Sequence, residues 1–177
     1  MLADVHTPLQ LPAAILDDYL EQGWFRAGRT IFNTNFLHFD GKLYSALWLR
    51  LILNDFELSK SQNKKVKATN RFTFKVQPFK LTDEKEQLYA DYKTGISFNT
   101  ASSLYQLLFD YQDIILFNTY EVAAYEGERL IGLGVFDMGN NAAAGIVSFT
   151  HPDYKKYSLG AVIILKKIKF AKEQGLE

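Results

Sequence analysis

The residues best suited to chemistry lie in one stretch, from His151 to Gly160. It holds the run Tyr-Lys-Lys-Tyr-Ser-Leu-Gly, between a proline-containing break and a segment with helical periodicity. The free N–H groups at the start of a helix, together with the helix dipole, favour an anion such as a phosphate. Lys155 and Lys156 add positive charge. The stretch therefore indicates a phosphate-binding turn, and the alternative is an ordinary strand–helix connection with solvated lysines.

Two regular elements must hold this turn. Residues 142–150 are small and apolar, with β-branched members, which predicts a buried strand. Pro152 helps to end it, because proline fixes φ and lacks an amide proton. Beyond the turn, apolar residues at helical spacing predict a helix that ends near Gly175; they are Ala161, Ile164, Leu165, Ile168 and Ala171. Lysines are expected on the rest of its surface, at Lys166, Lys167, Lys169 and Lys172.

A second candidate binding segment covers residues 55–70, with the sequence DFELSKSQNKKVKATN. It combines lysines with Ser, Gln and Asn. These residue types suit an RNA backbone, because Lys supplies charge and the others donate hydrogen bonds to phosphate and 2′-hydroxyl groups. On composition alone, an exposed loop or helix with ordinary lysines is the simpler interpretation.

The formal net charge is zero, but the charges are segregated. Residues 55–80 carry seven Lys/Arg against two acids, residues 81–137 carry three against ten, and residues 151–177 carry six against three. If the two basic segments fold side by side they would attract an anion. A solvated surface of mixed charge is the alternative.

The remaining pattern predicts alternating helices and strands. We expect helices at 13–20, 82–92 and 101–110, a hairpin of residues 30–39 and 43–53 around Asp40-Gly41, and strands at 71–78, 114–125 and 129–137. Gly132 and Gly134 inside a strand indicate close approach of a ligand or another backbone, or relief of packing against a helix.

Composition excludes several kinds of site. The chain has 177 residues and no Cys, so disulfides, thiolate metal sites and a cysteine nucleophile are excluded. His38 has no second His or Cys at metal-ligand spacing, so no metal site is predicted. The sequence shows no signal peptide and no apolar run long enough for a membrane span. We expect a cytoplasmic protein without a membrane partner.

Three segments in order resemble the aminoacyl-tRNA–protein transferases, the arginyl- and leucyl-transferase family. The stretch from His151 to Gly160, with its His-Pro-Asp and Ser-Leu-Gly, is similar to the signature of their GNAT-like C-terminal half. The run 23–29, Gly-Trp-Phe-Arg-Ala-Gly-Arg, is similar to their Gly-aromatic-Arg-x-Gly segment, and residues 59–62 to their Ser-x-Ser-Gln stretch. The resemblance implies an α+β, GNAT-like fold with a mixed, mostly antiparallel sheet flanked by helices. It also implies an N-terminal helix and hairpin segment (1–54) and a GNAT-like domain (55–177), with one continuous domain as the alternative.

The resemblance further implies transfer of arginine or leucine from aminoacyl-tRNA, the co-substrate, to a protein or peptide N-terminus, without a cofactor. Candidate catalytic groups are Asp137, which matches an Asp of the family, His151 and Tyr157. The donor phosphate would contact Lys155, Lys156, Ser158, Leu159 and Gly160. The tRNA would contact Arg26, Arg29, Ser61, Gln62, Lys64, Lys65, Lys67 and Asn70.

The sequence also departs from the family. The family carries clustered cysteines that help to bind a metal or iron–sulfur centre, and the corresponding stretch, 32–50, has none. His151 stands where the family has Asp, and Val147 where it usually has Tyr. The family continues into further strands beyond position 175; two explanations stay open, that the sequence is truncated before these strands or that this protein dispenses with them. Two alternatives stay open: an N-acyltransferase of the GNAT type that uses acetyl-CoA, and a non-catalytic binding module of the same fold.

Overall fold

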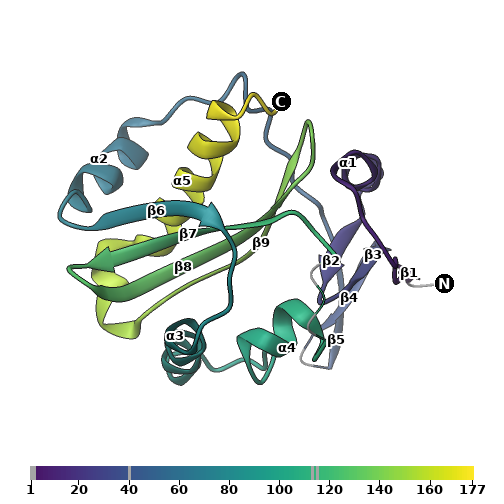
Figure 1. Ribbon diagram of the computed structural model, residues 1–177, viewed down its shortest axis with the longest axis horizontal. Helices are drawn as coiled ribbons and strands as arrows, with labels where there is room; N and C mark the ends of the chain where they lie inside the picture. The colour runs from purple at the N-terminus through teal and green to yellow at the C-terminus, as the bar shows by residue number, and fades with distance from the viewer. Residues whose placement is uncertain (1–2, 40, 113, 115) are drawn as a thin grey trace.

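A four-stranded antiparallel sheet forms the centre of the protein. The computed structural model describes residues 3–39, 41–112, 114 and 116–177. The strands of the sheet lie in chain order: β6 (Thr73–Pro78), β7 (Thr119–Glu126), β8 (Arg129–Met138) and β9 (Ala143–Thr150). Helix α5 (Leu159–Glu173) covers one face, and α3 (Asp83–Thr94) and α4 (Leu104–Phe109) lie on the other (Figure 1). The predicted α+β class with a mostly antiparallel sheet is confirmed, and its relation to the GNAT fold stays a prediction.

Two glycines of β8 let helix α5 lie close to the sheet. A Cβ atom at Gly134 would come within 2.2 Å of Ile163 Cγ2, and one at Gly132 within 2.9 Å of Ile163 Cδ1. Any larger residue would force the helix away, because protein interiors have no spare space at van der Waals distance. Of the two interpretations of these glycines, packing against a helix is the one that the structure supports.

The buried face of α5 differs from the predicted stripe. Leu159, Val162 and Ile163 are buried against the sheet, whereas Ile164 is 49% exposed. Lys167, expected among the solvated lysines, is buried. Of the predicted stripe, Leu165 and Ala171 are buried and Ile168 packs against the core, so the prediction is confirmed for these residues and wrong for Ile164. Apolar residues occupy both sides of this helix, so periodicity alone did not separate the side that meets the sheet from the exposed side.

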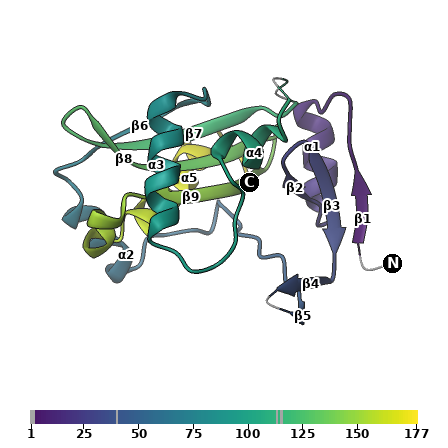
Figure 2. The same cartoon turned by 90° about the horizontal axis from the view of Figure 1, so that it is seen from below.

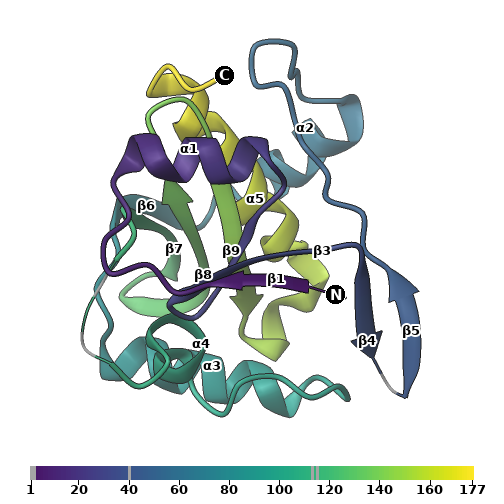
Figure 3. The same ribbon diagram turned by 90° about the vertical axis from the view of Figure 1, so that its right-hand side faces the viewer.

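The N-terminal region forms a separate small sheet beside the main one (Figures 2 and 3). It consists of β1 (Ala3–His6), β3 (Thr30–Thr34) and β2 (Phe25–Ala27), with helix α1 (Ala13–Glu21) packed on it. The single predicted hairpin from residue 30 is wrong, because the first strand stops at Thr34. That strand, β3, pairs with β1 and β2. A separate short hairpin of β4 (Phe36–Phe39) and β5 (Lys42–Ser45) follows it.

The turn of that short hairpin contains Gly41, whose φ of +72° favours glycine, while Asp40 lies outside the described residues. Strand β7 begins at Thr119 and not at 114, and residue 115 of the predicted strand also lies outside the described part. Helix α4 begins at Leu104, after Ser103, whose Oγ accepts a hydrogen bond from the Gln106 amide (3.0 Å).

Helix α1 connects the N-terminal region to the main sheet. The Asp17 carboxylate accepts hydrogen bonds from the backbone amides of Asn140, Asn141 and Ala142, at 2.8–3.0 Å, in the β8–β9 turn. Leu16 and Ile31 pack against Phe117, which precedes β7. The boundary at residue 54 between two parts of the chain stays a prediction. None of the helices within the described residues is long and apolar enough to cross a membrane.

Candidate functional site

The predicted phosphate-binding turn is a short 3₁₀ helix, η1 (Pro152–Tyr157), that leads directly into α5. Ser158 joins them in the left-handed conformation, with φ +54°. Lys155, Lys156 and Ser158 are exposed at this junction. A Cβ atom at Gly160 would meet no heavy atom within 4 Å, so the first turn of α5 has open space beside it. Lys155 Nζ donates to the carbonyl of Gly95, just after α3, at 3.4 Å, and the Lys156 ammonium lies 5.1 Å from the centre of the Tyr157 ring. The start of α5 itself favours a phosphate.

A network of polar side chains holds Tyr154, a buried residue of η1. The Tyr154 hydroxyl donates to Glu126 Oε2 (2.6 Å), and Arg71 Nη2 lies 2.6 Å from Glu126 Oε1. The hydrogen bond to Glu126 raises the pKa of Tyr154, and the same bond lowers the pKa of Glu126. The end of β7 thereby holds η1 in position.

His151 is part of this network and is poorly placed to act as a base. Arg129 Nη2 lies 2.9 Å from His151 Nε2. Because a guanidinium can only donate, Nε2 accepts this hydrogen bond. Nδ1 faces the backbone amide of Asp153 at 3.3 Å and its carboxylate at 3.5 Å. Both ring nitrogens are thus engaged within the protein, and the lone pair of Nε2 that a general base would use is taken by Arg129.

The structure separates Asp137 from the other two catalytic candidates. The amide of His151 bonds to the carbonyl of Ile131 (2.9 Å), whereas Asp137 lies six residues further along β8 and pairs with Ala144. Six residues of strand span roughly 20 Å. Asp137, His151 and Tyr157 therefore do not form one catalytic group, and this expectation is wrong.

Asp137 instead forms a buried ion pair with Arg26. Arg26 Nη1 lies 2.8 Å from Asp137 Oδ1, and the Thr119 hydroxyl donates to the same oxygen at 2.6 Å. Arg26 also donates to the carbonyls of Gly28 and Leu108. The Arg26 side chain is 4% exposed, so it is not available to a tRNA phosphate. The predicted tRNA contact of Arg26 is thus replaced by a structural link between β2 and the main sheet.

Arg29 is also away from the basic segment. Its Nη1 donates to Gln112 Oε1, beyond the end of α4. Figure 1 shows β2 and β3 on the opposite side of the main sheet from helix α2 (Lys60–Ala68). The structure therefore does not bring Arg29 together with the other predicted tRNA contacts.

Most of those contacts lie on α2 itself. Ser59 and Gln62 form a capping box, in which each side chain accepts from the backbone amide of the other (3.2 and 2.7 Å). The amide oxygen of Gln62 is thus used to start the helix. The other predicted tRNA contacts in this segment are exposed on α2 or just after it; they are Ser61, Lys64, Lys65, Lys67 and Asn70.

The two basic segments lie side by side, on the same face of the sheet. Lys172 Nζ of α5 donates to the carbonyls of Asn54 and Phe56, at 3.3 and 3.2 Å, which ties the segment before α2 to α5. The helices line a common groove of about 280 Å³, with lysines 166, 169 and 172 along it. The sequence left open whether the two basic segments meet, and the structure places them side by side.

Sequence reasoning also missed that Lys167 is buried. Lys167 Nζ donates to the carbonyls of Val135 and Val147 and to Ser148 Oγ, at 2.8–3.0 Å, between β8 and β9. Burial lowers the pKa of Lys167 to about 7, although Asp137 acts to raise it. The signal that could have found it is Gly134, since a Cβ there would come within 2.6 Å of Lys167 Cε.

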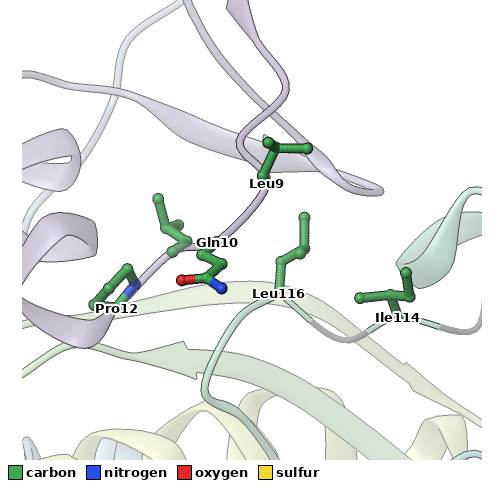
Figure 4. A pocket seen from close by; sticks show the side chains of 6 residues that line it. Leu9, Gln10, Pro12, Ile114 and Leu116 are labelled. Atoms are coloured by element: carbon green, nitrogen blue, oxygen red, sulfur yellow. The ribbon is translucent and has the colours of Figure 1, made fainter.

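Another pocket, of about 370 Å³, opens between the N-terminal segment and the chain before β7 (Figure 4). The described residues that line it carry no ionisable side chain; they are Leu9, Gln10, Leu11, Pro12, Ile114 and Leu116. These residues offer no acid, base or cation for group transfer. Within the described residues, no group of three or more His, Asp or Glu side chains could hold a metal ion.

Comparison with known proteins assigns the chain to a family. Three relatives, each named aspartate/glutamate leucyltransferase, are 25% identical to it. The protein from Campylobacter jejuni (strain RM1221) aligns over 94% of this chain and 70% of its own length. Those from Leptospira interrogans (serovar copenhageni) and Helicobacter hepaticus align over 96% and 89% of this chain, and each over 66% of its own length. Residues 84–177, more than half of the chain, match the family described as arginine-tRNA-protein transferase, C terminus. The chain belongs to this family of arginine-tRNA-protein transferases.

Proposed function

We propose that this protein transfers leucine from leucyl-tRNA to proteins that begin with aspartate or glutamate. Family membership supports an aminoacyl-tRNA donor and a protein acceptor, and the names of the three relatives support this choice of amino acid and acceptor. The structural observation that carries the proposal is the single basic surface that α2 and α5 form, because tRNA binding depends on neutralising phosphates.

In the reaction, the α-amine of the acceptor attacks the ester carbonyl of the charged tRNA. A C–N bond forms, the C–O bond to the terminal ribose breaks, and the amine proton passes to the ribose oxygen through solvent. An α-amino group has a pKa near 8, so part of it is neutral at pH 7 and no strong base is needed. The protein's contribution is then to orient the two substrates and to hold the donor at the η1–α5 turn.

The test is a transfer assay with the purified chain. Radiolabelled leucyl-tRNA and arginyl-tRNA are offered with peptides that begin with Asp, Glu or Lys. We expect leucine to appear on the Asp and Glu peptides. Label on none of the peptides would contradict the proposed activity, and label from arginyl-tRNA alone would contradict the choice of amino acid. Acetyl-CoA as the donor tests the acyl-CoA alternative, and we propose that no cofactor is needed.

Replacing Lys64 and Lys65 by alanine is expected to weaken tRNA binding. Two lost phosphate contacts should lower the slope of log K against log salt by about 1.5, so the difference from the unmodified protein should be largest at low salt. Titrations at several salt concentrations measure this. The matched control replaces Lys42 and Lys80, two exposed lysines outside α2 and α5. Equal slopes for all three proteins would remove α2 from the tRNA surface.

Replacing Gly160 by tryptophan is expected to abolish binding of the donor while leaving the protein folded. Its Cβ would meet no heavy atom within 4 Å, so we expect the indole to occupy the space beside the first turn of α5 where the donor would bind. Leucyl-tRNA binding and thermal unfolding are measured together, with Gly160→Ala as the control. A folded Gly160→Trp protein that still binds leucyl-tRNA normally would exclude this turn as the phosphate site.

A further inference from the structure

The groove between α2 and α5 has an apolar floor inside a basic surface. Its apolar lining residues are Phe56, Leu58, Val66, Leu165 and Ile168, and its other lining residues are three lysines. Leu58 is 39% exposed and Phe56 is half-buried. An aromatic ring on the wall of an open apolar groove is a surface on which a flat ligand can stack.

The lysines restrict what can occupy the groove. Lys172 is fixed on the carbonyls of Asn54 and Phe56, and the Lys166 ammonium lies 5.0 Å from the centre of the Phe74 ring. Lys169 pairs with Glu173 at 3.5 Å, and both are exposed. Among the residues that the structure describes, no carboxylate lines the groove itself. The three groove lysines all belong to α5, so the lining favours an occupant that combines an apolar part with negative charge beside that helix.

We propose that this groove receives one unpaired nucleobase of the bound RNA, stacked against Phe56, with the adjoining phosphates on the groove lysines and those of α2. An unstacked nucleotide has both of the required parts, since proteins bind single-stranded RNA by stacking its bases and neutralising its backbone. The inference rests on the proposed function, because it assumes that the basic surface binds tRNA. An acidic amphipathic peptide has similar chemistry, but it does not account for the lysines that continue along α2 outside the groove.

The test compares two RNA probes of the same stem-loop, one blunt and one with a four-nucleotide single-stranded 3′ extension. Each position of the extension carries 2-aminopurine in turn. We expect the extended probe to bind more tightly and one 2-aminopurine to change its fluorescence on binding. Phe56→Ala should weaken binding of the extended probe about tenfold and leave the blunt probe unchanged, because only the extended probe has a base to stack.

Two further variants keep the test decisive. Leu58→Glu places a carboxylate at an exposed position of the groove and should have the same selective effect even if Phe56→Ala unfolds the chain. Ile164→Ala changes an exposed apolar residue of α5 outside the groove and should affect neither probe.

The outcomes separate the two proposals. If both probes bind equally and the groove variants change neither, the base site is excluded while the basic surface stands. If the unmodified protein binds neither probe, the tRNA-binding surface fails and the base site fails with it. Binding of an acidic amphipathic peptide that Leu58→Glu abolishes, with no effect on either RNA, would assign the groove to a protein partner.

Discussion

Replacing Arg26 by methionine is expected to lower the free energy of unfolding by about 3–5 kcal/mol, the typical cost of removing one partner from a buried ion pair. Asp137 is fully buried and would lose the cation that lies 2.8 Å from its carboxylate. The link between β2 and the end of β8 would also be lost, so we expect the N-terminal region to become more accessible to proteases. Denaturant unfolding and limited proteolysis measure the two effects.

The matched control is Arg71→Met, which removes an arginine–carboxylate pair at the surface. Arg71 Nη2 lies 2.6 Å from Glu126, but the two side chains are 60% and 36% exposed. Exposed pairs contribute about 0–1 kcal/mol, so this variant should remain close to the unmodified protein. Adding Asp137→Leu to Arg26→Met removes the stranded charge and should recover part of the lost stability. Equal effects of Arg26→Met and Arg71→Met would show that the buried pair is not a structural link.

Replacing Lys167 by methionine is expected to remove a pH dependence of stability. The pKa of Lys167 is about 7 in the folded protein and near 10.4 in an unfolded chain. Between these values the unfolded state holds a proton that the folded state has released, so the free energy of unfolding rises with pH by about 1.4 kcal/mol per unit. Below pH 7 both states are protonated and this slope vanishes. A methionine side chain does not titrate, so the Lys167→Met variant lacks this contribution.

The measurement is denaturant unfolding of both proteins from pH 6 to pH 9.5, and the readout is the difference between the two curves. Other titrating groups cancel in that difference, and a constant loss from the hydrogen bonds of Lys167 only offsets the difference without changing its slope with pH. Lys169→Met, which replaces an exposed lysine of the same helix, is the control and should give a flat difference. A flat difference for Lys167→Met as well would mean that this ammonium keeps its ordinary pKa in the folded protein.

Much of the local structure follows from the sequence alone. The strand at 142–150, the proline break after it and the helix to residue 173 are all present, because apolar periodicity and proline act over a few residues. The basic segments and the motif order were also sufficient to indicate the transferase family, which the family comparison confirms. These features depend on neighbouring residues, so no knowledge of distant contacts is needed to find them.

The functional arrangement was decided only by the tertiary structure. The sequence predicted that Asp137 lies near His151 and that Arg26 is exposed to tRNA. The strand register instead puts Asp137 at the other end of β8. There it forms an ion pair with Arg26, which is 111 residues away in the sequence. The sequence predicted a solvated Lys167, but its side chain is buried where it packs over Gly134. The charge pattern could not say whether α2 and α5 meet. Burial and ion pairing depend on which surfaces the chain brings together across the sheet, and residue types and spacing along the chain do not specify that.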